Sequence, residues 1–225
     1  MPVMRTLYLV RHGQASFGAA DYVQLSPLGT QQCHALGGWM RSHGLQFDAV
    51  LCGTLRRHVQ TLDALQDGHG SLPQALPWPG LNEYDSLALI RAIHPEPLAA
   101  PETPEAYKAH FRLLRDAMQA WMSGRTAPVG MPAYADWVAG ITSALVHVQR
   151  QCAGNVLLVS SGGPIATAVG HVLGTSPETT IELNLRIRNS AVTEIAFNPK
   201  RMHLVSFNHL PHLDAPERRN WVTHA

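Results

Sequence analysis

The chain has 225 residues, of which 45% are apolar, so it fits one globular domain with a sizeable core. Its net charge of +1, with no run of lysines and arginines, excludes general attraction to nucleic acid or membrane surfaces. Cys33, Cys52 and Cys152 lie far apart, which argues against a disulfide framework or structural zinc site. We expect a cytoplasmic protein, because residues 1–10 lack a signal-peptide core and no apolar stretch could span a membrane.

The chain opens with a strand followed by a helix. Residues 6–10 are apolar and run directly into Arg11-His12-Gly13, which predicts a buried strand with polar residues at its carboxyl end. Ser26-Pro27 is typical of an N-cap and first helical residue, and the helical spacing of apolar residues continues until Gly44. Ligands bind at the carboxyl ends of strands in open parallel sheets, so Arg11-His12-Gly13 is placed to contact one.

The pattern then repeats before it is interrupted. Residues 47–51 predict a second strand, and residues 57–65 predict a helix with Val59, Leu62 and Leu65 on its inner side. Between Gly68 and Pro104, prolines and glycines are dense, which predicts mostly loop. Two helices follow, and we expect their apolar stripes to be core: Tyr107, Phe111, Leu114, Met118 and Trp121 in the first, Tyr134, Trp137, Ile141, Leu145 and Val148 in the second.

The last third repeats the opening unit. Residues 156–159 predict a buried strand that ends in Ser160-Ser161-Gly162-Gly163, and residues 164–173 predict a helix that Gly174 ends. Residues 191–197 and 202–207 flank a turn and predict a hairpin. Together these elements predict one α/β domain over residues 1–225, with three α/β/α layers, a mostly parallel central sheet and an antiparallel edge hairpin. Residues 68–132 would form a cap of loops and helices.

Residues 11–14 and 160–163 form two polar, glycine-bearing turns that open helices. Such turns present backbone N–H groups and a helix dipole to an anion. Arg57 lies at the start of the helix after the second strand, and Glu83 lies in the loop region. These features predict a phosphoryl-binding site with His12 as the nucleophile.

Three segments carry a resemblance to a known family: Leu9-Val10-Arg11-His12-Gly13-Gln14, then Leu25-Ser26-Pro27-Leu28-Gly29-Thr30-Gln31-Gln32, and Leu55 with Arg57, Gln60 and Thr61. From Leu7 to about Phe197 the chain resembles the histidine phosphatase superfamily, in the branch of cofactor-dependent phosphoglycerate mutases and many small phosphatases. The resemblance implies a phosphoglycerate mutase-like fold in which His12 is phosphorylated and Arg11 and Arg57 clamp the phosphoryl oxygens. It also implies that Glu83 protonates the leaving group, with no metal and no cofactor.

One position departs from the family pattern. Where the family has a second core histidine in a His-Gly-Gly turn, this chain has Ser161-Gly162-Gly163. With Gly13, Ser161 and Gly162 are expected to contact phosphate, but serine brings no positive charge. A charge-assisted hydrogen bond contributes about 1.5–3 kcal/mol and a neutral one about 0.5–1.5 kcal/mol, so binding would weaken roughly tenfold. Slow catalysis and no catalysis both stay open.

Several residues have competing interpretations. His58, His209 or His212 could compensate for Ser161, although a surface histidine is the ordinary explanation for each. His209 and His212 have the spacing of a metal pair but no evident third ligand. Arg56 competes with Arg57, whose spacing to Gln60-Thr61 matches the family, and Asp85 and Glu96 compete with Glu83. Aromatic residues that could line a cap are Trp78, Tyr84, Tyr107 and Trp121.

Three functions remain open from the sequence. The first is a phosphomonoesterase that acts on a small phosphorylated molecule. The second is a phosphoglycerate mutase, but the mutases' tryptophan-asparagine segment is absent and Leu81-Asn82-Glu83 continues into Tyr84-Asp85-Ser86-Leu87 instead of Arg-His-Tyr-Gly. The third is a non-catalytic module that binds phosphate or a phosphorylated ligand, which Ser161 favours. A homodimer is the default expectation for the assembly.

Overall fold

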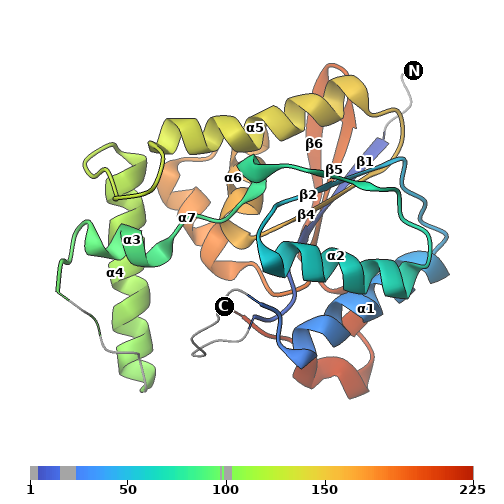
Figure 1. Cartoon of the computed structure of the whole chain (residues 1–225), viewed down its shortest axis with the longest axis horizontal. Coiled ribbons are helices and arrows are strands. Elements are labelled where there is room, and N and C mark those ends of the chain that lie inside the picture. The colour runs from blue at the N-terminus through green and yellow to red at the C-terminus, as the bar shows by residue number, and fades with distance from the viewer. Residues whose placement is uncertain (1–4, 16–23, 97, 99–102, 225) are drawn as a thin grey trace.

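The protein is described by a computed structural model that covers residues 5–15, 24–96, 98 and 103–224. Its centre is a six-stranded sheet with the order β3-β2-β4-β1-β5-β6 (Figure 1). The strands are β1 (Arg5–Arg11), β2 (Ala49–Cys52), β3 (Ala75–Pro77), β4 (Val156–Ser160), β5 (Val192–Asn198) and β6 (Arg201–His209). Strands β1 to β4 pair in parallel, whereas β5 pairs antiparallel with both β1 and β6. The predicted mostly parallel sheet with an antiparallel edge hairpin is confirmed.

Helices cover both faces of the sheet and give the predicted three layers (Figure 1). They are α1 (Pro27–Ser42), α2 (Arg56–His69), α3 (Ser86–Arg91), α4 (Pro104–Met122), α5 (Tyr134–Gln151), α6 (Gly162–Leu173) and α7 (Pro177–Arg186), with short 3-10 helices η1 (Pro79–Leu81), η2 (Pro211–Leu213) and η3 (Pro216–Trp221). Across the described ranges, no helix combines the length and the apolar character needed to cross a membrane.

Strand β1 shows how the sequence builds the layers. Leu7 and Leu9 pack in the core beneath α5 and α6, whereas Tyr8 and Val10 pack in the core beneath α1 and α2. Successive side chains of a strand point to opposite faces, so a continuous apolar run is what a strand covered on both faces requires. The reading of residues 6–10 as a buried strand is confirmed.

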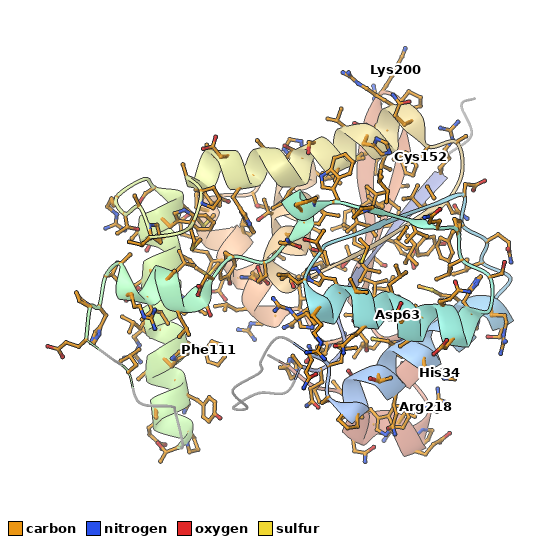
Figure 2. All side chains as sticks on the ribbon, viewed as in Figure 1. His34, Asp63, Phe111, Cys152, Lys200 and Arg218 are labelled. Atoms are coloured by element: carbon orange, nitrogen blue, oxygen red, sulfur yellow. The ribbon has the colours of Figure 1, made fainter. Side chains whose placement is uncertain are left out.

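A third apolar cluster joins α3, α4 and α7 at one side of the sheet (Figure 1). Its buried members include Leu89, Met118, Trp121 and Ile181, and Phe111 on α4 packs partly buried against it (Figure 2). At the opposite end of the molecule Lys200 lies at the turn between β5 and β6 (Figure 2). Helices α3 and α4, which lie within residues 68–132, thus share a small core with α7 beside the main sheet, and the role of these residues as a cap stays a prediction.

Some sequence expectations were wrong in detail. Val59 is 46% exposed and Tyr107 is 38% exposed, so neither belongs to the core. Most of the described residues between Gly68 and Pro104 are loop, as expected, but the short strand β3, which joins the central sheet, and the short helix α3 were missed. Helix α7, which the Ser176 side chain caps by accepting a hydrogen bond from the Thr179 N–H, was missed. A Ser-Pro pair signals that start, as it does at α1.

Candidate active site

The site lies where the carboxyl ends of parallel strands meet. Arg11 is the last residue of β1 and pairs with Ser160, the last residue of β4. His12 and Ser161 follow these two residues, and the His12 N–H donates to the Ser160 carbonyl at 2.9 Å. The two polar turns that the sequence singled out are therefore neighbours at one edge of the sheet.

His12 is held in one orientation and one protonation form. Its side chain is 3% exposed, and its Nδ1 lies 2.7 Å from the Gly13 carbonyl oxygen, which can only accept. Nδ1 therefore carries the proton and Nε2 presents its lone pair. Burial, and then the charges of Arg11 and Arg57, hold the pKa of His12 well below 6.5. The imidazole is neutral at physiological pH, which is the state a nucleophile needs.

Two arginines lie beside this histidine. Arg11 is 5% exposed, and its guanidinium donates from Nη1 to the Ile187 carbonyl. Arg57, 9% exposed, lies in the first turn of α2, and its Nη2 is 3.5 Å from Ser161 Oγ. Its neighbour Arg56 is exposed. The structure thus brings Arg11 and Arg57 to the site and leaves Arg56 outside it.

Glu83 reaches the same edge from the segment after η1. Its Oε2 accepts a hydrogen bond from the Gly163 N–H at 3.1 Å, and its Oε1 accepts one from the Tyr84 N–H at 3.3 Å. Burial raises the pKa of Glu83 above 4.5, although the bond from Gly163 and the nearby arginines oppose the shift. A raised pKa favours the protonated carboxyl that can donate a proton.

The two competing carboxylates lie elsewhere. Asp85 caps α3, where its Oδ1 accepts from the Leu87 and Ala88 N–H groups, and Glu96 is exposed. A carboxylate that is already occupied by capping has a structural explanation. Of the three acids considered from the sequence, Glu83 is the one that contacts the α6 turn.

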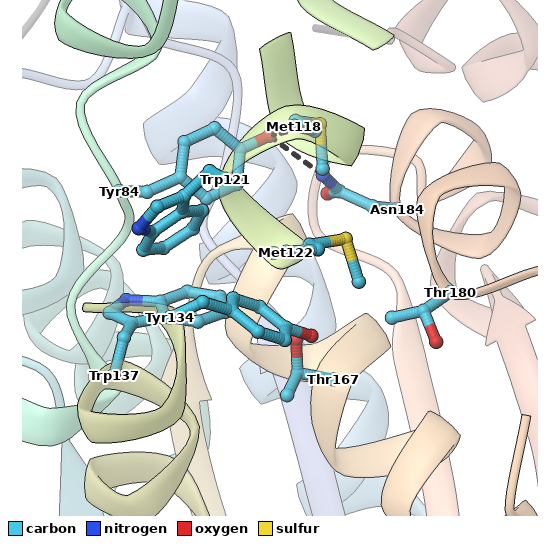
Figure 3. A pocket seen from close by; sticks show the side chains of 10 residues that line it. Tyr84, Met118, Trp121, Met122, Tyr134, Trp137, Thr167, Thr180 and Asn184 are labelled. Atoms are coloured by element: carbon cyan, nitrogen blue, oxygen red, sulfur yellow. Dashed lines mark hydrogen bonds between the residues drawn. The ribbon is translucent and has the colours of Figure 1, made fainter. Parts of the chain in front are cut away.

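An aromatic pocket supports the Glu83 segment (Figure 3). Tyr84, Trp121 and Trp137 line it, and Trp137 Nε1 donates to the Asn82 carbonyl at 3.2 Å. Asn184 Nδ2 donates to the Tyr84 hydroxyl at 2.7 Å (Figure 3). Tyr84 and Trp121 line this pocket, whereas Tyr107, which is exposed, and Trp78, which is half-buried and donates from Nε1 to the Gly140 carbonyl, do not. That these aromatic residues line a cap over the phosphoryl-binding site stays a prediction.

The remaining motif residues fix the loop behind His12. The Gly13 N–H donates to Thr61 Oγ1 at 3.2 Å, and the Leu25 N–H donates to Gln60 Oε1 at 2.9 Å. A Cβ at Gly13 would lie only 2.3 Å from the Gly29 carbonyl oxygen, so this close approach requires glycine. Because its N–H is already engaged, Gly13 contributes here by close packing, and its expected contact with phosphate stays a prediction.

Ser161 is fully buried at the start of α6, with Gly162 next to it and close to Arg11: a Cβ at Gly162 would lie 3.8 Å from Arg11 Nε. His58 Nε2 lies 2.7 Å from Ser161 Oγ, and its ring centroid is 6.0 Å from that of His12. Among the three unassigned histidines, His58 is therefore the one placed at the site.

The other two unassigned histidines lie apart from the phosphoryl-binding residues. His209 is exposed on β6, whereas His212 is buried with its Nε2 3.0 Å from Ser190 Oγ. The description of His58 and His212 as surface residues was wrong. Within the described part of the chain, no group of three or more His, Cys, Asp or Glu side chains is placed to bind a metal.

Two residues that the sequence analysis did not identify, Asn189 and Ser190, contact the backbone carbonyl of the nucleophile. The Ser190 N–H donates to the His12 carbonyl at 3.1 Å, and Asn189 Nδ2 is 3.5 Å from the same oxygen. Ser190 has a positive φ of 56°, a conformation that is uncommon for a residue with a side chain. A serine before β5 carries no motif, so only the fold could identify this support.

Comparisons with known proteins identify the family of the chain. The profile of the histidine phosphatase superfamily (branch 1) matches residues 7–210. A 2,3-bisphosphoglycerate-dependent phosphoglycerate mutase from Nitratidesulfovibrio vulgaris is 26% identical over 213 residues, which cover 81% of this chain and 83% of that protein.

Two solved structures show the shared fold. Phosphoserine phosphatase from Entamoeba histolytica, in complex with 3-phosphoglyceric acid, has a TM-score of 0.65 at 22% identity and covers 93% of this chain and 99% of its own. Phosphoglycerate mutase from Bacillus anthracis has a TM-score of 0.64 at 18% identity and covers 94% of this chain and 96% of its own. From its sequence profile and its phosphoglycerate mutase-like fold, the chain belongs to the histidine phosphatase superfamily.

Proposed function

We propose that the protein is a phosphomonoesterase that hydrolyses a small phosphorylated molecule through a phosphohistidine on His12. The observation that carries this proposal is the His12 ring, whose Nδ1 proton is committed to the Gly13 carbonyl and whose Nε2 is therefore free to attack. Membership of the superfamily supports a phosphatase.

In the first step, His12 Nε2 attacks phosphorus and the bond from phosphorus to the leaving oxygen breaks. Arg11 and Arg57 offset the negative charge on the phosphoryl oxygens, as guanidinium groups do in other phosphoryl transfers. The Glu83 carboxyl gives its proton to the departing alkoxide, which leaves as an alcohol. The products of this step are phosphorylated His12 and a Glu83 carboxylate.

In the second step, water attacks the phosphohistidine. Glu83, now a carboxylate, takes the proton from water, and the nitrogen–phosphorus bond breaks to return the electron pair to His12 Nε2. Inorganic phosphate leaves, and Glu83 is again protonated for the next cycle. The raised pKa of Glu83 suits both steps of the cycle, because its carboxyl must hold a proton before the first step and accept a proton during the second.

A phosphate-binding module without catalysis is the second candidate, because Ser161 occupies a position where the family pattern has a histidine. Such a module would keep Arg11 and Arg57 for binding but would turn over substrate slowly or not at all. Interactions that stabilise the bound substrate and the transition state equally give affinity but do not increase the rate of the chemical step.

The test is hydrolysis of p-nitrophenyl phosphate and of an alkyl phosphate by wild type, His12→Ala and Ser161→His. We expect wild type to be active and His12→Ala to lose activity by about 10³-fold or more, as for removal of a nucleophile. If wild type is no faster than His12→Ala while Ser161→His is active, the binding module takes the place of the phosphatase.

A further inference from the structure

We propose that His58 is a positioning residue that acts through Ser161: its Nε2–H donates to Ser161 Oγ and so directs the Ser161 hydroxyl proton to the bound phosphoryl group. The inference rests on the proposed phosphoryl site and assigns a role to a residue that its sequence motif leaves without one. In this arrangement the Ser161 hydroxyl donates to the phosphoryl group, and His58 orients that hydroxyl.

The geometry of the pair supports a specific contact. His58 and Ser161 are both fully buried, and their side chains meet at 2.7 Å although 103 residues separate them in the chain. His58 follows Arg57 in the first turn of α2, and Ser161 is the N-cap of α6 without a side-chain capping bond. Because Ser161 Oγ does not cap its own helix, it is free to serve the site.

The protonation of His58 follows from its surroundings. Burial, with a smaller effect of Arg57, lowers the pKa of His58 to about 3, so the ring is neutral and carries a single N–H. Its Nδ1 is buried with no hydrogen-bond partner and packs against Gly53, where a Cβ would lie 2.2 Å from it. A buried N–H without an acceptor is rare, so the proton belongs on Nε2.

The consequence for Ser161 is directional. With His58 Nε2–H donating at 2.7 Å and Arg57 Nη2 lying 3.5 Å away, Ser161 Oγ is on the accepting side of both contacts. Its own hydroxyl proton is then left for a third group, which must be an acceptor. An anion beside His12 and Arg57 would supply that acceptor.

The kinetic test uses His58→Leu, His58→Gln, Ser161→Ala and the double variant His58→Leu/Ser161→Ala. We expect His58→Leu and Ser161→Ala each to lower kcat/KM by about tenfold or more. The kcat/KM of the double variant should be no lower than that of the less active single variant. His58→Gln, whose amide still donates, should recover most of the loss. Losses that multiply in the double variant, or a His58→Gln no better than His58→Leu, would overturn the proposal.

His69→Leu is the matched control. His69 is 3% exposed at the other end of the same helix, and its Nε2 contacts the Leu45 carbonyl at 2.9 Å. Its substitution removes a buried histidine and its hydrogen bonds with Leu45 and Ser71, and none of these residues belongs to the site. We expect His69→Leu to lower the melting temperature while kcat/KM stays within about twofold of wild type. An equal kinetic loss in His69→Leu would reduce the effect of His58 to helix stability and contradict the proposal.

A second readout does not depend on turnover. Nitrogen-15 NMR of the imidazole rings should show His58 as the Nε2–H tautomer, and inorganic phosphate should shift its signals in wild type but not in Ser161→Ala. Wild type without hydrolysis but with this shift would refute the phosphatase and keep the His58–Ser161 pair. Three results would each overturn the proposed role of His58: an Nδ1–H tautomer, no shift of the His58 signals with phosphate in wild type, or equal phosphate affinity in wild type and His58→Leu.

Discussion

His212 makes the stability of the fold depend on pH in the acid range. It is 3% exposed, and burial, with smaller effects of Arg218 and His209, lowers its pKa from 6.5 to about 3. Between pH 6.5 and about pH 3, His212 is protonated in the unfolded chain but neutral in the folded protein. The free energy of unfolding therefore falls as the pH falls through this range. The free energy lost is about 1.4 kcal/mol per pH unit, which amounts to about 2 kcal/mol from this one group between pH 7 and pH 5.

The measurement is urea unfolding of wild type and His212→Gln at pH 7 and at pH 5. Acidification lowers the free energy of unfolding through the lowered pKa of His58 and raises it through the raised pKa of Glu83. Both effects are the same in the two proteins, so the difference between them reports on His212. We expect wild type to lose about 2 kcal/mol more than His212→Gln. His203→Gln, which removes an exposed histidine from β6, is the control. Equal losses in wild type and His212→Gln would show that His212 does not couple folding to proton binding in this pH range.

Three further predictions concern the site and its packing. Glu83→Gln should slow hydrolysis of an alkyl phosphate by about 10²–10⁴-fold but that of p-nitrophenyl phosphate far less, because a stable phenolate leaves without a proton; equal losses with both substrates would contradict the acid role. Arg57→Lys should lower kcat/KM by about 10²-fold or more while Arg56→Lys stays near wild type, as steady-state kinetics will show. Gly13→Ala, whose Cβ would meet the Gly29 carbonyl at 2.3 Å, should lower the free energy of unfolding by about 1–3 kcal/mol, whereas Gly38→Ala, with open space around it inside α1, should raise it by about 0.5–1 kcal/mol; a stable Gly13→Ala would count against this packing.

Local patterns were sufficient to predict five of the six strands and the edge of the sheet on which the site lies. The apolar run before Arg11-His12-Gly13 and the run before Ser160-Ser161 predicted two buried strands, and parallel pairing brings their ends together. Arg57 could be preferred to Arg56 by motif spacing, and the structure buries Arg57 and exposes Arg56. These features depend on neighbours within a few residues, which a sequence displays directly.

Features that depend on distant contacts were not predictable. Val59 has helical spacing with Leu62 but is 46% exposed. The rotation of a helix about its own axis decides which side chains at the edge of its apolar stripe face the sheet. The contact between His58 and Ser161 joins α2 to α6 across 103 residues. Periodicity cannot show which of several histidines turns inward to such a partner.

In the proposed mechanism, His12 becomes phosphorylated during turnover. The direct measurement is rapid quenching of wild type with substrate into base, where phosphohistidine survives, followed by mass spectrometry of the peptide that contains Arg11-His12-Gly13. We predict a phosphoryl group on His12 that appears within one turnover and is absent from His12→Ala. A phosphoryl group on Ser161, or hydrolysis by His12→Ala at the wild-type rate, would contradict the mechanism.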